Sequence, residues 1–217
     1  SIFAHIPGLK VVMPSSPQNA YYLLKDSIFD PNPVVFLEHR WLHNLKSNVS
    51  YKKSNKLSGS KVVKKGKDLT IITMSWAVHD VLDVSKRLNK EGIDIEVIDL
   101  SVIKPIFWKN IFASIKKTGR LLVIDTGAYT GSISSEIISE ISINYSSRLK
   151  TPPIKIAMPD FPEPTSYGLT KNFYFDKLKI IKNIKKILKI KKTLQIEKNI
   201  KLPTHHDVPG EWFTGPF

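Results

Sequence analysis

The chain has 217 residues, of which 41% are hydrophobic and 24% are charged, a balance typical of a globular protein with a real core. It contains no cysteine, which excludes disulfides, thiolate metal sites and cysteine nucleophiles and fits a reducing compartment. The first residues do not resemble a secretory signal, and no apolar stretch approaches the roughly 20 residues that span a bilayer. We therefore expect a cytoplasmic protein with no membrane partner.

The formal net charge of +14 raises the question of nucleic-acid binding. Much of the excess lies in residues 176–202, where Lys alternates with Ile and Leu as on the polar face of an amphipathic helix. Arginine is scarce, and neither a helix-turn-helix nor an RNA-binding motif is present. We interpret the lysines as a solvated helix face and predict no nucleic-acid partner.

The first forty residues alternate between short apolar runs and one helical pattern. Residues 10–14 read as a buried strand closed by Pro14. Ser16 as the cap and Pro17 at the first helical position predict a helix over 17–29, and a second strand follows over 34–38. The helix is expected to bury four apolar side chains, namely Ala20, Leu23, Leu24 and Ile28.

Residues 39–67 are rich in Ser, Asn and Lys and poor in periodic apolar residues, so they predict a linker. Beyond them strands and helices alternate, which indicates parallel strands with right-handed crossovers. Strands are expected over 69–74, 93–100, 120–126 and 153–158, and helices over 78–88, 105–117, 132–145 and 175–190. The aromatic-rich end, residues 203–217, is expected to be irregular.

Several motifs resemble catalytic or metal sites but are incomplete. Asp125-Thr126-Gly127 is similar to an aspartic protease loop, but that chemistry needs a second carboxylate and an all-β fold, so a strand end is preferred. Gly66-Lys67-Asp68 lacks the spacing of a phosphate loop, and no dinucleotide fingerprint is present. The remaining candidates are histidines, which lack the ligand number that zinc needs and are interpreted as surface or interface residues: His39 with His43, and His205-His206-Asp207.

An ordered set of segments resembles the beta subunits of thiamine-diphosphate-dependent pyruvate and branched-chain 2-oxoacid dehydrogenases, in the transketolase superfamily. Residues 3–17 are similar to the stretch that follows the family's His-Ser-Gln triplet. Residues 30–38 resemble its "D-x-N-P-V-V-x-L-E" strand, and residues 66–73 resemble the start of its C-terminal domain. Residues 95–105 resemble "E-V-I-D-L-R-T-I-x-P", and residues 117–123 continue the match. Residues 39–60, 75–79 and 161–166 depart from the family pattern, which indicates a divergent subgroup.

The resemblance implies an α/β architecture. Residues 1–40 would be the end of a pyrimidine-binding domain, and residues 41–65 a linker. Residues 66–192 would be a three-layer α/β/α transketolase C-terminal domain with a mostly parallel sheet, and residues 193–217 an irregular tail. The chain would therefore be N-terminally incomplete.

The resemblance also implies which groups the chain lacks. In the family, an activating glutamate and the histidine of the triplet lie upstream of the position of Ser1, and the alpha subunit holds the diphosphate and Mg²⁺. We therefore predict no catalytic and no cofactor-binding residue in this chain. The expected partners are the alpha subunit, a second beta subunit and a lipoyl acyltransferase component.

One family site has matching positions in this chain. The family can bind a monovalent cation such as K⁺ with carbonyls near the "D-x-N-P" strand, and the matching residues are Ser27, Ile28, Asp30 and Asn32. A plain helix stop is the alternative. For the whole chain, the alternative to an enzyme subunit is a non-catalytic interaction module, or half of a split transketolase or deoxyxylulose-phosphate-synthase-like enzyme.

Overall fold

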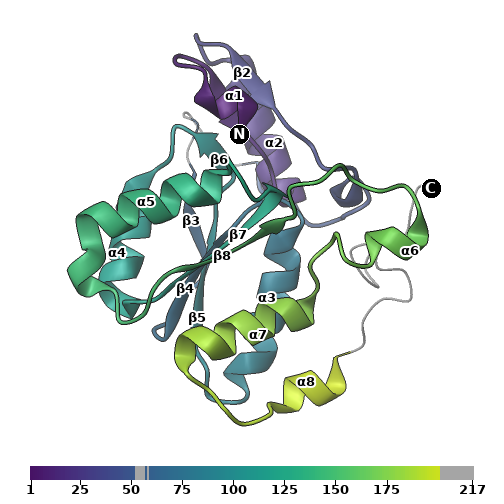
Figure 1. Cartoon of the computed structure of the whole chain (residues 1–217). Coiled ribbons are helices and arrows are strands. Elements are labelled where there is room, and N and C mark those ends of the chain that lie inside the picture. The colour runs from purple at the N-terminus through teal and green to yellow at the C-terminus, as the bar shows by residue number, and fades with distance from the viewer. Residues whose placement is uncertain (52–56, 58, 201–217) are drawn as a thin grey trace.

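The computed structural model describes residues 1–51, 57 and 59–200. These residues form a larger five-stranded sheet with helices on both faces, and a smaller three-stranded sheet that contains the N-terminal segment (Figure 1). The larger sheet confirms the α/β fold with mostly parallel strands that the sequence predicts.

The five-stranded sheet has the order β3-β5-β4-β7-β8. Strands β4 and β5 are buried from end to end because helices cover both faces, which is why they are rich in apolar residues. Strands β5, β4, β7 and β8 run parallel, and only the edge strand β3 is antiparallel to its neighbour. Their bounds are β3 Lys61–Lys64, β4 Leu69–Thr73, β5 Ile95–Asp99, β7 Leu121–Ala128 and β8 Ile154–Met158.

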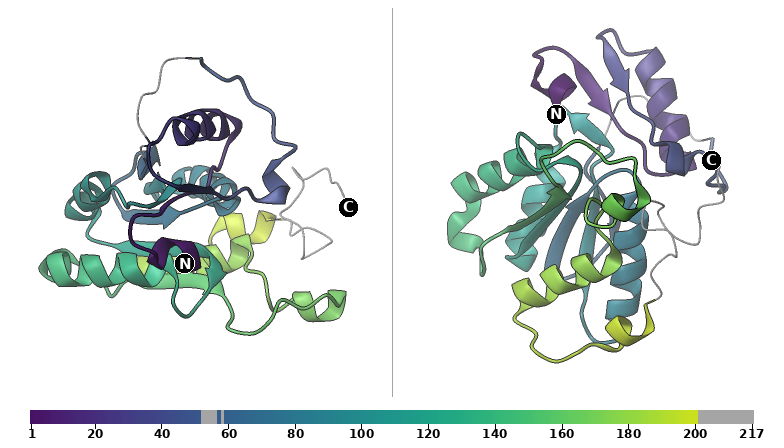
Figure 2. Two further views of the ribbon diagram at one scale, coloured as in Figure 1. Left: turned by 90° about the horizontal axis from the view of Figure 1, so that it is seen from above. Right: turned by 45° about the vertical axis from the view of Figure 1, so that its right-hand side comes forward.

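Two helix layers complete this domain (Figures 1 and 2). Side chains alternate between the two faces, so Ile71 and Val97 enter one core while Ile72 and Ile98 enter the other. The first face is covered by α3 Ala77–Asn89 and α7 Lys177–Leu188, and the second by α4 Trp108–Thr118 and α5 Ile133–Tyr145. The predicted stop after α4 is confirmed, since Gly119 adopts a left-handed φ of 65°.

The three-stranded sheet joins the N-terminal segment to the larger domain. Its order is β2-β1-β6, with β1 Lys10–Val12 parallel to β2 Val34–Phe36 and antiparallel to β6 Val102–Lys104. A short helix, α1 Ile2–His5, precedes β1. Because β6 follows β5 in the larger domain, this sheet fixes the N-terminal segment on that domain.

Helix α2 Pro17–Ile28 begins as predicted, with the Ser16 side chain accepting from the Asn19 amide. Its predicted burial is only partly right. Leu23 is buried, but Leu24 and Ile28 are 47% and 69% exposed. The helix packs on a sheet of only three strands, which covers the stripe around Leu23 and leaves the neighbouring face open.

Part of the segment predicted as a linker is ordered in the fold. Strand β3 lies within it and pairs with β5, and its residues alternate between exposed and half-buried positions, as in an edge strand with one face in solvent. A 3₁₀ turn, η1 Arg40–Leu42, buries Trp41. The Trp41 ring lies 5.0 Å from that of Trp76, which stacks at 4.9 Å on Phe175. This aromatic cluster anchors the start of the segment on the larger domain.

The region expected to be an irregular tail begins with a helix, α8 Gln195–Asn199, which follows α6 Tyr167–Thr170 and α7 in the chain. The carboxylate of Glu91 on the first helix layer accepts from the amides of Gln195 and Ile196, which holds α8 in place. The other residues of the predicted tail, 201–217, include His205, His206 and Asp207 and lie outside the described residues. Among the described residues, no helix is long and apolar enough to cross a bilayer.

Candidate functional site

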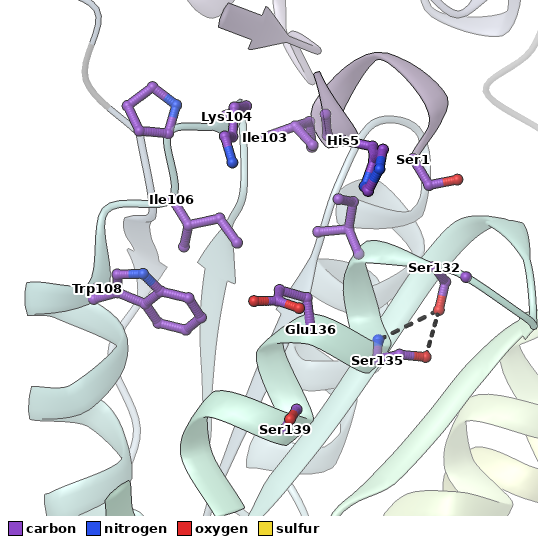
Figure 3. Close-up of a pocket in the computed structure, with 14 residues that line it drawn as sticks. Ser1, His5, Ile103, Lys104, Ile106, Trp108, Ser132, Ser135, Glu136 and Ser139 are labelled. Atoms are coloured by element: carbon purple, nitrogen blue, oxygen red, sulfur yellow. Dashed lines mark hydrogen bonds between the residues drawn. The ribbon is translucent and has the colours of Figure 1, made fainter. Parts of the chain in front are cut away.

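A pocket of about 690 Å³ lies where the N-terminal segment meets the larger domain. Three separate parts of the chain line it: α1, the connection from β6 to α4, and the first turns of α5 (Figure 3). The pairing of β1 with β6 brings the first two together, and the parallel sheet places the start of α5 beside them.

The pocket is lined by charged, hydroxyl and apolar groups. His5, Lys104 and Glu136 are exposed. Lys104 lies on the same side as Ile106 and Trp108, and His5, Ser132 and Ser135 lie on the other side (Figure 3). Such a surface can bind an amphipathic group through one charge and one ring or aliphatic contact.

The start of α5 is held by hydrogen bonds of serine hydroxyls and of one carboxylate. Ser132 caps the helix by accepting from the Ser135 amide, and its hydroxyl shares hydrogen bonds with Ser134 and Ser135. Both oxygens of Asp125 are occupied, because they accept from the amides of Gly127 and Ser134. The Asp-Thr-Gly motif is thus the end of a strand in an α/β sheet, as predicted.

Two kinds of arrangement are absent from the part of the chain that the structure describes. No serine of the pocket is hydrogen-bonded to a histidine there, and no three His, Asp or Glu side chains gather as metal ligands. A diphosphate with its Mg²⁺ needs oxygen ligands for the metal together with donors for the phosphates. Of such ligands the pocket lining contributes one carboxylate, Glu136, and it forms no cluster of three metal-binding side chains among the described residues.

The four residues matched to a monovalent cation site are only partly available. The Lys10 ammonium lies 2.6 Å from Oδ2 of Asp30, and the amide and side chain of Asn32 donate to Oδ1. These contacts, that of Lys10 first, lower the pKa of Asp30 to about 2. The Ser27 carbonyl accepts from the Asp30 amide, while Ile28 is exposed. A cation there would share Asp30 with Lys10.

The first pair of histidines is divided between core and surface. His39 is half-buried, its ring lies 4.8 Å from that of Trp41, and burial lowers its pKa to about 4. His43 is exposed and lies 3.7 Å from Glu38. His39 therefore packs in the aromatic cluster, whereas His43 is a surface residue.

Sequence patterns give little indication of the residues that the fold brings together at the pocket. His5 and Lys104 lie in segments that resemble the family but belong to no catalytic or binding motif, and Glu136 looks like an ordinary first-turn acid of a helix. A local pattern does mark a different residue, Asp99. It ends a buried strand, which places a carboxylate at the ligand-binding edge of a parallel sheet.

Comparison with protein families matches both parts of the chain. Residues 59–180 match the transketolase C-terminal domain, and residues 1–45 match the transketolase pyrimidine-binding domain. A solved structure described as "Split gene transketolase, inactive beta4 tetramer" superposes with a TM-score of 0.69 and 23% identity, covering 88% of this chain and 61% of that chain. This likeness supports the fold alone.

Curated relatives share more of the sequence. The "Pyruvate dehydrogenase E1 component subunit beta" of Porphyra purpurea is 38% identical over 184 residues, covering 84% of this chain and 56% of the relative. Its counterpart in Bacillus subtilis is 36% identical over 167 residues, which cover 76% of this chain and 51% of the relative.

A third relative has a different printed activity. The "Acetoin:2,6-dichlorophenolindophenol oxidoreductase subunit beta" of Cupriavidus necator is 34% identical over 168 residues, covering 76% of this chain and 49% of the relative. The chain thus spans about half the length of the curated relatives it matches. With a transketolase C-terminal domain across more than half of its residues, the chain belongs to the transketolase family and is related to the beta subunits of 2-oxoacid dehydrogenases.

Proposed function

We propose that the chain is part of the beta subunit of a thiamine-diphosphate-dependent 2-oxoacid dehydrogenase, in which it forms scaffold and subunit contacts. The observation that carries this proposal is the 38% identity over 184 residues to a pyruvate dehydrogenase beta subunit, which extends over both matched domains. The complete assembly would decarboxylate a 2-oxoacid and pass the acyl group to lipoamide. The coenzyme supplies the electron sink for that chemistry.

A scaffold role is supported by what the described residues contain. They form a well-packed three-layer domain, and no serine that lines the pocket at the junction is hydrogen-bonded to a histidine among these residues. We propose that thiamine diphosphate and Mg²⁺ are held by other segments and by the alpha subunit. Isothermal titration of this chain with thiamine diphosphate and Mg²⁺ should give no binding heat, and saturable binding would contradict this part of the proposal.

The end of α2 is the surface that we assign to a partner subunit. Leu24, Ile28 and Phe29 are 47%, 69% and 77% exposed and follow one another on one side of the helix end. Exposed apolar groups of this kind mark protein contacts. We propose that an alpha subunit or a second beta subunit covers them, and that a lipoyl acyltransferase component binds the finished assembly.

The decisive experiment is reconstitution of the full-length protein with its neighbouring alpha subunit. We expect reduction of dichlorophenolindophenol that depends on pyruvate, a branched-chain 2-oxoacid or acetoin, in the presence of thiamine diphosphate and Mg²⁺. Phe29→Lys should weaken assembly, whereas Ile143→Lys, on an exposed position of α5, should not. An assembly that forms but turns over none of these substrates refutes the proposal. Turnover of a ketose donor instead would favour the split transketolase.

We also propose a cation site and a cellular compartment. A monovalent cation would bind at the end of α2 beside Lys10 and Asp30. Equal melting temperatures in KCl and in choline chloride at matched ionic strength would refute that site. A reducing, cytoplasmic compartment stays a prediction from the absence of cysteine, and an exported or organellar location of the tagged full-length protein would contradict it.

A further inference from the structure

A buried carboxylate links the N-terminal segment to the larger domain. Asp99 is the last residue of β5 and is 1% exposed. Its Oδ2 accepts from the Ser15 hydroxyl at 2.5 Å and from the Asn19 side-chain amide at 3.1 Å. Ser15 and Asn19 belong to the segment that matches the pyrimidine-binding domain, so these two bonds cross the junction between the domains.

The other oxygen of the Asp99 carboxylate, Oδ1, is buried and has no hydrogen bond. This holds for the described residues, 1–51, 57 and 59–200. Thr73 pairs with Asp99 on the adjacent parallel strand, so both side chains leave the sheet on the same face. The Thr73 hydroxyl is also buried and has no partner among the same residues. An ionised Asp99 would leave Oδ1 as a buried, charge-bearing oxygen without a hydrogen bond among these residues, and a proton on Oδ1 removes that charge.

The charged groups around Asp99 are few. Lys61 of β3 pairs with Asp99 across the sheet and exerts a favourable charge at a distance. His79 of α3 contacts the Ser15 carbonyl at 2.7 Å, and the α2 side supplies only the uncharged Ser15 and Asn19. Burial raises the pKa of Asp99 to about 6, against the opposing effects of Ser15 and Lys61, and burial lowers the pKa of His79.

We propose that Asp99 is a proton-operated clamp, whose neutral form keeps the N-terminal segment closed on the C-terminal domain because the cost of burying the ionised carboxylate outweighs the stronger hydrogen bonds that Ser15 and Asn19 would donate to it. The proton resides on Oδ1 and leaves to solvent when the clamp ionises, and the buried anion that remains favours opening of the junction. This inference concerns the chain's own junction and does not depend on the proposed catalytic function.

The direction of the pH effect follows from linkage. The folded pKa is raised from 3.8 to about 6, so the closed junction binds more protons than the open one between these values. The stabilisation of the closed junction by protonated Asp99 is therefore complete below pH 3.8 and is lost as the pH rises through about 6. Between pH 5 and pH 8 the opening equilibrium attributable to Asp99 should rise about tenfold. Because burial lowers the pKa of His79, its protonation would favour opening as the pH falls, which is opposite to the effect of Asp99. The measurement must therefore separate the contribution of Asp99 from that of His79.

Hydrogen exchange of the full chain measures this opening. Protection factors for amides of β1, β6 and residues 13–19 are compared in the wild type and in Asp99→Asn, which keeps an acceptor for Ser15 and Asn19 but cannot ionise. The ratio of mutant to wild-type protection should rise about tenfold from pH 5 to pH 8. A ratio that stays constant overturns the proposal.

A titration of the wild type keeps the proposal testable if Asp99→Asn does not fold. The carboxyl ¹³C shift of Asp99 should titrate near pH 6, and an ordinary midpoint near 4 would overturn the clamp. Ser15→Ala removes a bond that favours the ionised form, so it should move the midpoint upward. A purely structural Ser15 would leave the midpoint unchanged, which would also contradict the proposal.

Discussion

Gly66 is the position where one added methyl group should harm the fold most clearly. It precedes β4 and lies against the backbone at the start of β5. A Cβ at this position would lie 2.2 Å from the Ile95 carbonyl carbon and 2.3 Å from the Glu96 nitrogen. Both atoms are main-chain atoms of a buried strand, so no flexible side chain can move aside. Gly66→Ala must therefore push the turn away from β5.

The loss can be worked out from the hydrogen bonds that tie this turn to β5. The Gly66 amide donates to the Glu96 carboxylate at 3.3 Å, and the amides of Lys67 and Asp68 donate to the Asp94 carbonyl at 3.0 and 2.9 Å. Three bonds at about 1 kcal/mol each give a loss of about 3 kcal/mol. For a protein of this size that corresponds to a fall in melting temperature of roughly 6–12 °C.

Urea denaturation and thermal melting of the full chain test this value. Gly168→Ala is the matched control, because its Cβ would meet nothing within 4 Å and its φ is not left-handed. That variant should stay within about 0.5 kcal/mol of the wild type or gain slightly. If Gly66→Ala were as stable as Gly168→Ala, the close approach of the turn to β5 would be wrong.

Two other variants examine the first helix layer. Lys177→Met removes the ammonium that lies 3.7 Å from Asp80, whose pKa burial raises to about 7. The variant should therefore lose more stability at pH 8, where Asp80 is charged, than at pH 5. Urea midpoints at both pH values check this, with Lys179→Met at an exposed position as the control, and equal losses at the two pH values would contradict it. Ile181→Ala in the core of α7 should lose about 2–5 kcal/mol in the same assay, whereas Ile143→Ala, at a 73% exposed position, should lose little, and similar losses for both would rule out the assigned packing.

The parts of the fold that sequence reasoning predicted share one property, which is a strong local pattern. The inner strands β4 and β5 are rich in Ile, Val and Thr, and α2 has both its Ser16 cap and Pro17. The missed strands β3 and β6 are short, and each is stabilised by a partner strand distant in the sequence. Helix α8 was missed for a related reason, since Glu91 of a remote segment holds its first amides.

The site was harder to predict than the fold. Its pocket combines His5, Lys104 and Glu136 from three segments whose proximity depends on the pairing of β1 with β6. No local pattern reports such proximity. The burial of Leu24 and Ile28 was wrong because helical periodicity identifies an apolar face but not whether a neighbour covers it.

The position of β6 also determines the order in which the chain can fold. Val11 has its antiparallel partner at Lys104, so the small sheet must wait during synthesis until β4, α3 and β5 have left the ribosome. Closing so long a loop carries an entropic cost before any pairing energy is gained. The N-terminal segment should therefore be the last part to become protected in refolding, and it is the stretch that a chaperone would have to shield in the meantime.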